Sequence, residues 1–197
     1  MDARALIDFL RVMERLKDAP RHCWTTGGRR ESVAEHSWRV ALMAMLMADE
    51  FPEADMDKVV RMCLVHDIGE AVTGDIPTFQ KTDGDRAVED RAVDGLIGML
   101  PAPWPGELRA LFDEMDAQQS GEARLYKALD RMEAIQSHNE SDPATWLPLE
   151  FTLNLTYGES NAAFSPFLTE LRAEMRRDTD ALIEDAKARG IAPKVSE

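Results

Sequence analysis

The sequence has few of the features that mark secreted or membrane-spanning proteins. Its 197 residues include only two cysteines, Cys23 and Cys63, which are too few for a disulfide framework and fit a reducing compartment. The longest apolar run, residues 40–48, is much shorter than the ~20 residues that cross a bilayer. Three charges interrupt residues 1–10, where a signal peptide would need an apolar core. We therefore expect a cytoplasmic protein without a membrane partner.

Basic residues are also scarce. The chain has 23 lysines and arginines against 37 acidic residues, a formal net charge of −14. This balance disfavours nucleic-acid polymers, because phosphate contacts need clustered Lys and Arg. The negative net charge still allows a small anionic substrate, since a binding pocket needs only a few basic side chains nearby. The hydrophobic share of 44% is that of an ordinary globular protein, so general disorder is excluded.

Strand signals are missing as well, and the spacing of apolar residues predicts helices throughout. A capping box at Ser32–Glu35 and a Ser165-Pro166 start mark two of the helices. The expected helices cover residues 2–18, 32–51, 56–71, 86–99, 105–118, 121–140 and 166–189. Residues 144–157 are either a helix or irregular, and residues 20–31 and 73–84 are expected to be loops. Length and even composition predict a single domain over residues 1–197, with the last few residues as a flexible tail.

Chemistry-bearing side chains gather near the end of the third predicted helix. His66, Asp67 and Glu70 occur there in the run HDIGE. On a helix these residues are three or four apart or adjacent, so an imidazole and two carboxylates would face one region. They follow a mostly apolar face, and buried charges need partners or a metal. A His–Asp pair alone is more often a structural hydrogen-bonded pair.

Two further helices each carry a side chain suited to metal binding. His36 lies at the start of the apolar helix, in the run EHSW. Asp130 lies in the run ALDRME on a later helix with an apolar stripe. Either residue alone would be interpreted as structural, but together with His66 and Asp67 they form a set that three helices could bring together.

This order of residues resembles the HD-domain metal-dependent phosphohydrolases. The contexts ESVAEHSWRVALMA, LVHDIGEAVTGD and LYKALDRMEA are similar to the branch that contains the 5′-deoxynucleotidases. The resemblance covers roughly residues 1–185 and implies an all-α fold, the HD-domain helical bundle. It also implies an enzyme that removes phosphate from (deoxy)nucleoside 5′-monophosphates, and a nucleotide as the small-molecule partner.

The resemblance implies a ligand set for one divalent metal ion: His36, His66, Asp67 and Asp130. Two imidazoles and two carboxylates suit Co, Mn, Fe or Zn better than Mg. Water bound to such a metal becomes a nucleophile near neutral pH. Glu70 and Asp75 match family carboxylates that assist this water and the leaving group. As structural alternatives, Glu70 could pair with an arginine and Asp75 could form an Asx-turn.

Substrate binding is expected in the arginine-rich segment before the first ligand helix. Arg21 and Trp24 match an Arg and a Trp that contact the nucleotide in the resembling enzymes. A guanidinium binds phosphate bidentately, and an indole stacks on a sugar or base. Some family members have these two residues adjacent, whereas two residues separate them here.

Several alternatives remain open. The two-metal HD enzymes have extra histidines between the His-Asp pair and the last Asp, and residues 68–129 contain none. A zinc site at His22 and Cys23 would need further ligands nearby, since the CxxC spacing is absent. Hydrolysis of another small phosphate ester is the second interpretation, and a non-catalytic helical adaptor is the third. Related enzymes commonly self-associate, so a homodimer is also considered.

Overall fold

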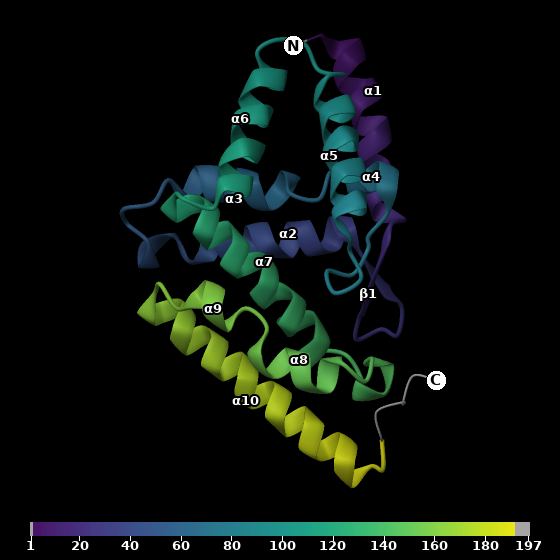
Figure 1. The fold of residues 1–197 in the computed structure, drawn as a ribbon, viewed down its shortest axis with the longest axis vertical. Coiled ribbons are helices and arrows are strands. Elements are labelled where there is room, and N and C mark those ends of the chain that lie inside the picture. The colour runs from purple at the N-terminus through teal and green to yellow at the C-terminus, as the bar shows by residue number, and fades with distance from the viewer. Residues whose placement is uncertain (1, 192–197) are drawn as a thin grey trace. The chain divides into compact units, whose positions relative to one another are not determined.

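A computed structural model describes residues 2–191 and is largely helical (Figure 1). Its elements are α1 (Ala3–Met13), β1 (Pro20–Trp24), β2 (Arg30–Ser32), α2 (Val33–Leu46), α3 (Met56–Val65), α4 (Glu70–Thr73), α5 (Asp83–Ile97), α6 (Trp104–Ala117), α7 (Gly121–Asn139), α8 (Glu150–Thr156), α9 (Glu159–Ala162) and α10 (Pro166–Ala188). Short 3-10 turns occur at Glu14–Lys17, Ala48–Glu50 and Pro143–Thr145. The predicted all-α class is confirmed, and none of the described helices is long and apolar enough to span a membrane.

The chain divides into two compact units, which are described separately. The first contains residues 1–22 and 31–126, and the second contains residues 23–30 and 127–197. The single domain over residues 1–197 stays a prediction. Residues 192–197, in the predicted flexible tail, lie outside the described part of the chain.

Local capping signals start the two helices for which they were predicted. The Ser32 hydroxyl accepts a hydrogen bond from the Glu35 N–H at 3.3 Å, and Glu35 Oε2 accepts one from the Ser32 N–H at 2.9 Å. This confirms the capping box at the start of α2. The Ser165 hydroxyl accepts from the Leu168 N–H at 3.3 Å at the start of α10.

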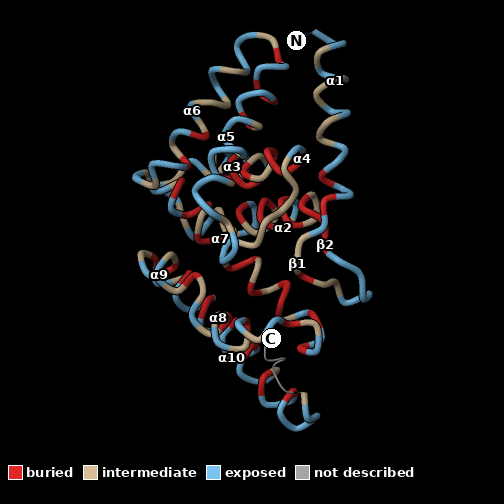
Figure 2. Tube along the Cα trace, turned by 45° about the vertical axis from the view of Figure 1, so that its right-hand side comes forward, coloured by how far each residue is buried: buried red, intermediate tan, exposed pale blue. Residues whose placement is uncertain are grey.

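In the first unit, α2 packs against α3. Both helices contribute buried side chains to the core (Figure 2), including Val40, Ala44, Val59 and Met62. The far end of α2 is less buried: Met45 is 57% exposed and Leu46 is 72% exposed.

In the second unit, α10 packs against α8 and α9. Arg172 on α10 is almost fully buried and donates hydrogen bonds to two backbone carbonyls, those of Tyr157 at 2.9 Å and Asn154 at 2.6 Å. These carbonyls lie at the end of α8, where the helix leaves them without partners of its own. The buried guanidinium therefore ties α10 to the end of α8.

Residues 20–31 form a hairpin, which corrects the prediction of an exposed loop. Strands β1 and β2 pair as a two-stranded sheet, and the Thr25 N–H donates to the Arg29 carbonyl at 2.8 Å to close the turn. Gly28 supplies a positive φ of 78° in this turn. The strands are five and three residues long, so they are too short to show an alternating apolar pattern. Cys23 and Glu31 are nonetheless buried.

Candidate metal and catalytic site

Helix α3 ends just before the HDIGE run, which corrects the prediction of one helix through residue 71. The Ile68 N–H bonds the Val65 carbonyl at 3.1 Å, and the Glu70 N–H bonds the Asp67 carbonyl at 3.0 Å. These bonds span three residues rather than four, so the chain turns more tightly than an α-helix. The tighter turns change the directions in which the side chains of this run point.

Gly69 lies where this turn meets α5. A Cβ atom there would lie 3.0 Å from Glu89 Cγ and 3.1 Å from Val93 Cγ2, both on α5. A side chain at this position would push the turn away from the helix. Glycine therefore allows the close approach that brings Glu89 near the HDIGE run.

Three potential metal ligands meet at the end of α3. His36 Nε2 and His66 Nε2 are 3.3 Å apart. Asp67 Oδ2 lies 3.0 Å from His66 Nε2 and 3.8 Å from His36 Nε2. Both imidazoles are buried. The structure thus brings together three of the four predicted ligands.

A backbone carbonyl fixes the tautomer of His66. Its Nδ1 lies 2.8 Å from the Cys63 carbonyl oxygen, and a carbonyl can only accept, so Nδ1 carries the proton. In the neutral ring the lone pair is then on Nε2, which faces His36 and Asp67. Metal-binding histidines are commonly oriented by such a bond on the other ring nitrogen. The Tyr126 ring, with its centroid 5.6 Å from that of His66, packs beside the imidazole.

These residues fit a divalent metal ion. Ligand atoms about 2.0–2.2 Å from a metal lie roughly 3.0–3.5 Å apart when they occupy neighbouring coordination positions. Two of the three separations, 3.0 Å and 3.3 Å, lie in this range, and the third, 3.8 Å between His36 Nε2 and Asp67 Oδ2, is slightly longer. Two imidazoles and a carboxylate are ligands that suit a borderline transition metal.

Carboxylates crowd the same region. Burial and three neighbouring carboxylates raise the pKa of Glu70 to about 10. These neighbours are Asp67, Asp75 and Glu89. Glu70 is only 5% exposed, and its Oε2 atom is buried without a hydrogen-bond partner among the described residues. A buried polar atom normally has a partner, so this oxygen indicates a place for a water, ion or substrate group.

Asp75 and Arg21 lie close enough to interact electrostatically. Burial raises the pKa of Asp75, and the positive charge of Arg21 acts in the opposite direction. Arg21 Nε also lies 3.3 Å from Glu31 Oε2, and both side chains are largely buried. A guanidinium near the carboxylate cluster could bind an anionic group. Lys81, paired with Glu89, is a further cation in this region.

Comparisons with known proteins agree with this geometry. A family model described as HD domain matches residues 13–172. The chain belongs to the HD-domain family. It is 33% identical over 191 residues to the human 5′-deoxynucleotidase HDDC2, which covers 93% of this chain and 91% of the human protein. It is 28% identical over 139 residues to the 5′-deoxynucleotidase hdd1 of Schizosaccharomyces pombe, covering 66% of this chain and 69% of that protein.

A solved structure has a similar fold. The crystal structure of a predicted metal-dependent phosphohydrolase from Magnetospirillum magnetotacticum matches with a TM-score of 0.74 and 29% identity. The match covers 96% of this chain and 95% of that chain. The predicted resemblance to HD-domain phosphohydrolases is thereby confirmed.

The other two predicted residues of the HD-domain site belong to the second unit. Asp130 lies on α7, where its Oδ2 is 2.8 Å from Lys127 Nζ. Trp24 lies at the end of β1, and the Arg30 guanidinium carbon is 4.9 Å from the centroid of its ring. The roles of Asp130 as a ligand and Trp24 as a substrate contact stay predictions.

Sequence reasoning missed three residues that surround the HD-domain ligands. Glu89 adds a carboxylate to the cluster around Glu70, Glu31 pairs with Arg21, and Tyr126 packs beside His66. The sequence offered one indication for Glu31, because an acidic residue directly after Arg29 and Arg30 can form an ion pair with an arginine. Glu89 and Tyr126 had none, because nothing in their local sequence separates them from other helix residues.

Replacing Gly69 with alanine tests the close approach of the turn to α5. We expect Gly69→Ala to lower the free energy of unfolding by about 1–3 kcal/mol, because the added methyl group overpacks against Glu89 and Val93. Urea unfolding followed by circular dichroism measures this loss. Gly95→Ala on α5 is the control, since a Cβ there meets no atom within 4 Å and alanine favours a helix. Equal stability of the two variants would contradict the packing argument.

Proposed function

We propose that this protein is a metal-dependent phosphohydrolase that removes phosphate from nucleoside 5′-monophosphates, with deoxyribonucleotides preferred. One observation carries the proposal. Two imidazole Nε2 atoms and the Asp67 carboxylate converge next to Glu70, whose buried Oε2 has no hydrogen-bond partner in the described part of the chain. The similarity to proteins named 5′-deoxynucleotidase supports the nucleotide as substrate.

His36, His66, Asp67 and Asp130 would hold the metal ion. The donor set favours Co, Mn, Fe or Zn over Mg. When bound, a divalent ion lowers the pKa of a coordinated water and stabilises negative charge on phosphoryl oxygens. The first three ligands support this assignment by their distances, and Asp130 enters it through the sequence resemblance.

Glu70 acts on the attacking water in this proposal. Its Oε2 atom is buried and has no hydrogen-bond partner within residues 2–191, so it can accept a proton from a water held beside Asp67. Burial is the first cause of its raised pKa, and the charges of Asp67, Asp75 and Glu89 add to it. A cation held in the cluster would offset those charges and favour the ionised carboxylate, which is the form that acts as a base. General bases of this kind contribute about 10²–10⁴-fold to a rate.

The remaining groups bind the substrate and handle the leaving group. Burial raises the pKa of Asp75, which favours the protonated acid that can donate to the departing 5′-oxygen. Arg21 binds the phosphate with its guanidinium, and Trp24 stacks on the sugar or base. These three assignments extend the sequence predictions.

The setting of this activity is also proposed from the sequence. The charge of −14 supports a small nucleotide rather than a nucleic-acid polymer as the partner. We propose a cytoplasmic enzyme without a membrane partner, formed by one HD domain over residues 1–197.

Phosphate release measures the activity directly. Metal-stripped protein is given Co²⁺, Mn²⁺, Zn²⁺ or Mg²⁺ together with paired deoxy- and ribonucleoside 5′-monophosphates. We expect release that depends on the metal, is lowest with Mg²⁺ and is faster for the deoxy substrate. Release from other phosphate esters but from neither nucleotide would contradict the nucleotidase and favour a hydrolase of another small phosphate ester. A lack of release from every ester would favour a non-catalytic adaptor.

Two substitutions distinguish the role of a metal ligand from the role of the group that accepts a proton. Glu70→Gln keeps the shape of the side chain but cannot accept a proton, so we expect an unchanged metal content and a kcat lowered about 10²–10⁴-fold. Asp130→Asn removes a charged ligand, so we expect metal loss in addition to lost turnover. Metal analysis and phosphate release on the same samples distinguish the two effects. Full activity of Glu70→Gln, or full metal content of Asp130→Asn, would contradict the corresponding role.

We further propose that the chain forms a homodimer through the exposed apolar side of α2. Trp38 and Met45 are seven residues apart and share one helix face, and they are 61% and 57% exposed. Leu46 beside them is 72% exposed. Grouped apolar side chains of this size commonly mark an interaction surface.

Sedimentation velocity tests the dimer. We expect Leu46→Glu to convert the dimer to a monomer, because a buried charge would be left unpaired. Leu10→Glu is the control, since Leu10 is 53% exposed but lies on α1. A monomeric wild-type protein, or a dimer that survives Leu46→Glu, would contradict this interface.

A further inference from the structure

We propose that the rings of Phe79 and His22 form a platform on which the base of the nucleotide stacks. The two rings meet edge to face, with centroids 5.6 Å apart and an interplanar angle of 87°. Both residues belong to the first unit, which also contains Glu70 and Asp75. The role assigned to this pair rests on the proposed function, for which it supplies the groups that hold the base.

Phe79 lies in a loop between α4 and α5 that is fixed at both ends. The loop leaves α4 at Gly74, whose positive φ of 73° turns the chain away from the helix. At the other end, Thr82 begins α5 through a capping box with Asp85. The two ends therefore hold the loop in a defined position relative to the carboxylate cluster.

A tight turn presents Phe79 at the surface of this loop. The Pro77 carbonyl accepts hydrogen bonds from the N–H groups of the third and fourth residues after it, at 2.7 Å and 3.1 Å. Phe79 lies within this turn and is 39% exposed. A single exposed phenylalanine needs no explanation by itself. This one, however, lies between Asp75 and Lys81, whose charges both act on Glu70.

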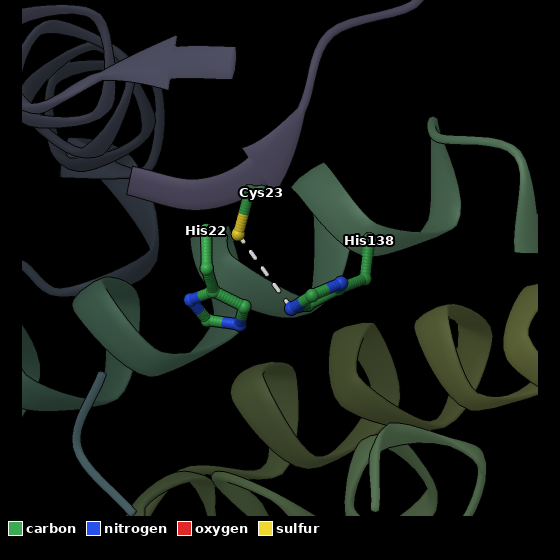
Figure 3. Close-up of side chains that lie close together, drawn as sticks. All are labelled: His22, Cys23 and His138. Carbon is green, nitrogen blue, oxygen red and sulfur yellow. Dashed lines mark hydrogen bonds between the residues drawn. The ribbon is translucent and has the colours of Figure 1, made fainter. Parts of the chain in front are cut away.

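The neighbours of His22 in β1 are both held by other side chains. Arg21 Nε lies 3.3 Å from Glu31 Oε2. Cys23 Sγ lies 3.5 Å from His138 Nε2 (Figure 3). These contacts hold the backbone of the strand on both sides of His22, so its imidazole has a fixed base from which to contact the phenyl ring.

The platform lies next to the groups expected to act on the phosphate. Burial raises the pKa of Asp75, and the positive charges of Arg21 and of protonated His22 act against this rise. Both residues of β1 therefore lie near the carboxyl that faces the leaving 5′-oxygen in the proposed function. Phe79 follows Asp75 by four residues, so their Cα atoms are at most about 14 Å apart. A 5′-nucleotide joins its base to its phosphate through a single sugar, which suits two groups on one short loop.

An aromatic platform matches nucleobases as a class. Every base has a π-face and can stack on an aromatic side chain. The phenyl ring of Phe79 has no hydrogen-bond donor or acceptor, so it does not distinguish the edges of the bases. Its contact with the imidazole of His22 restrains the ring, which reduces the entropy lost on binding. The platform thus favours a substrate with a base over one without, accepts all four bases and leaves the sugar to Trp24.

A substrate without a base tests the platform. Phosphate release by the metal-loaded enzyme is measured with a deoxynucleoside 5′-monophosphate and with 2-deoxyribose 5-phosphate, and the two kcat/KM values are expressed as a ratio. We expect Phe79→Ala to lower this ratio about 5-fold or more, mainly through a higher KM for the nucleotide. Phe79→Tyr keeps an aromatic ring and should retain the ratio of the wild type.

Two further positions complete the comparison. Trp104 on α6 is 41% exposed, much like Phe79, so Trp104→Ala is the matched control and should leave the ratio unchanged. His22→Ala removes the edge-to-face contact and should lower the ratio, whereas His22→Phe provides another aromatic edge and should restore it. An unchanged ratio in His22→Ala would contradict the positioning role of the imidazole.

Equal kcat/KM values for the two wild-type substrates, or a ratio that survives Phe79→Ala, would overturn the platform and leave the phosphohydrolase in place. Calorimetry tests the platform without turnover, in the metal-loaded Glu70→Gln protein. There the nucleotide should bind more tightly than 2-deoxyribose 5-phosphate, and the additional change Phe79→Ala should remove the difference. Equal binding of the two ligands would contradict the platform. Tighter binding of the nucleotide without phosphate release by the wild type would support the platform and contradict the proposed function.

Discussion

The first unit depends on a group of carboxylates that are close together and withdrawn from water. Burial, together with the negative charges of Asp67, Asp75 and Glu89, raises the pKa of Glu70 to about 10. Burial disfavours the charged carboxylate, and repulsion between like charges adds to this penalty. Stable folding therefore requires either bound protons or a compensating cation. The two imidazole Nε2 atoms beside Asp67 provide the remaining donors for such a cation.

The tight turn after α3 makes this gathering possible. Neighbouring side chains on an α-helix point about 100° apart, so His66 and Asp67 would diverge if α3 continued. The three-residue hydrogen bonds of the turn instead bring Asp67 Oδ2 to 3.0 Å from His66 Nε2. Gly69 then lets the turn approach α5, which carries Glu89. Ligand geometry and helix packing are thus two results of the same local break.

Features with local causes could be predicted from the sequence, and features made by distant residues could not. Ser32 and Ser165 cap helices through hydrogen bonds to residues three positions away, so their sequence neighbours reveal them. The hairpin is too short for a pattern, and its buried residues Cys23 and Glu31 are explained only by tertiary packing. His36, His66 and Asp67 could be named because their surrounding segments resemble a known family. Glu89 lacked both kinds of signal.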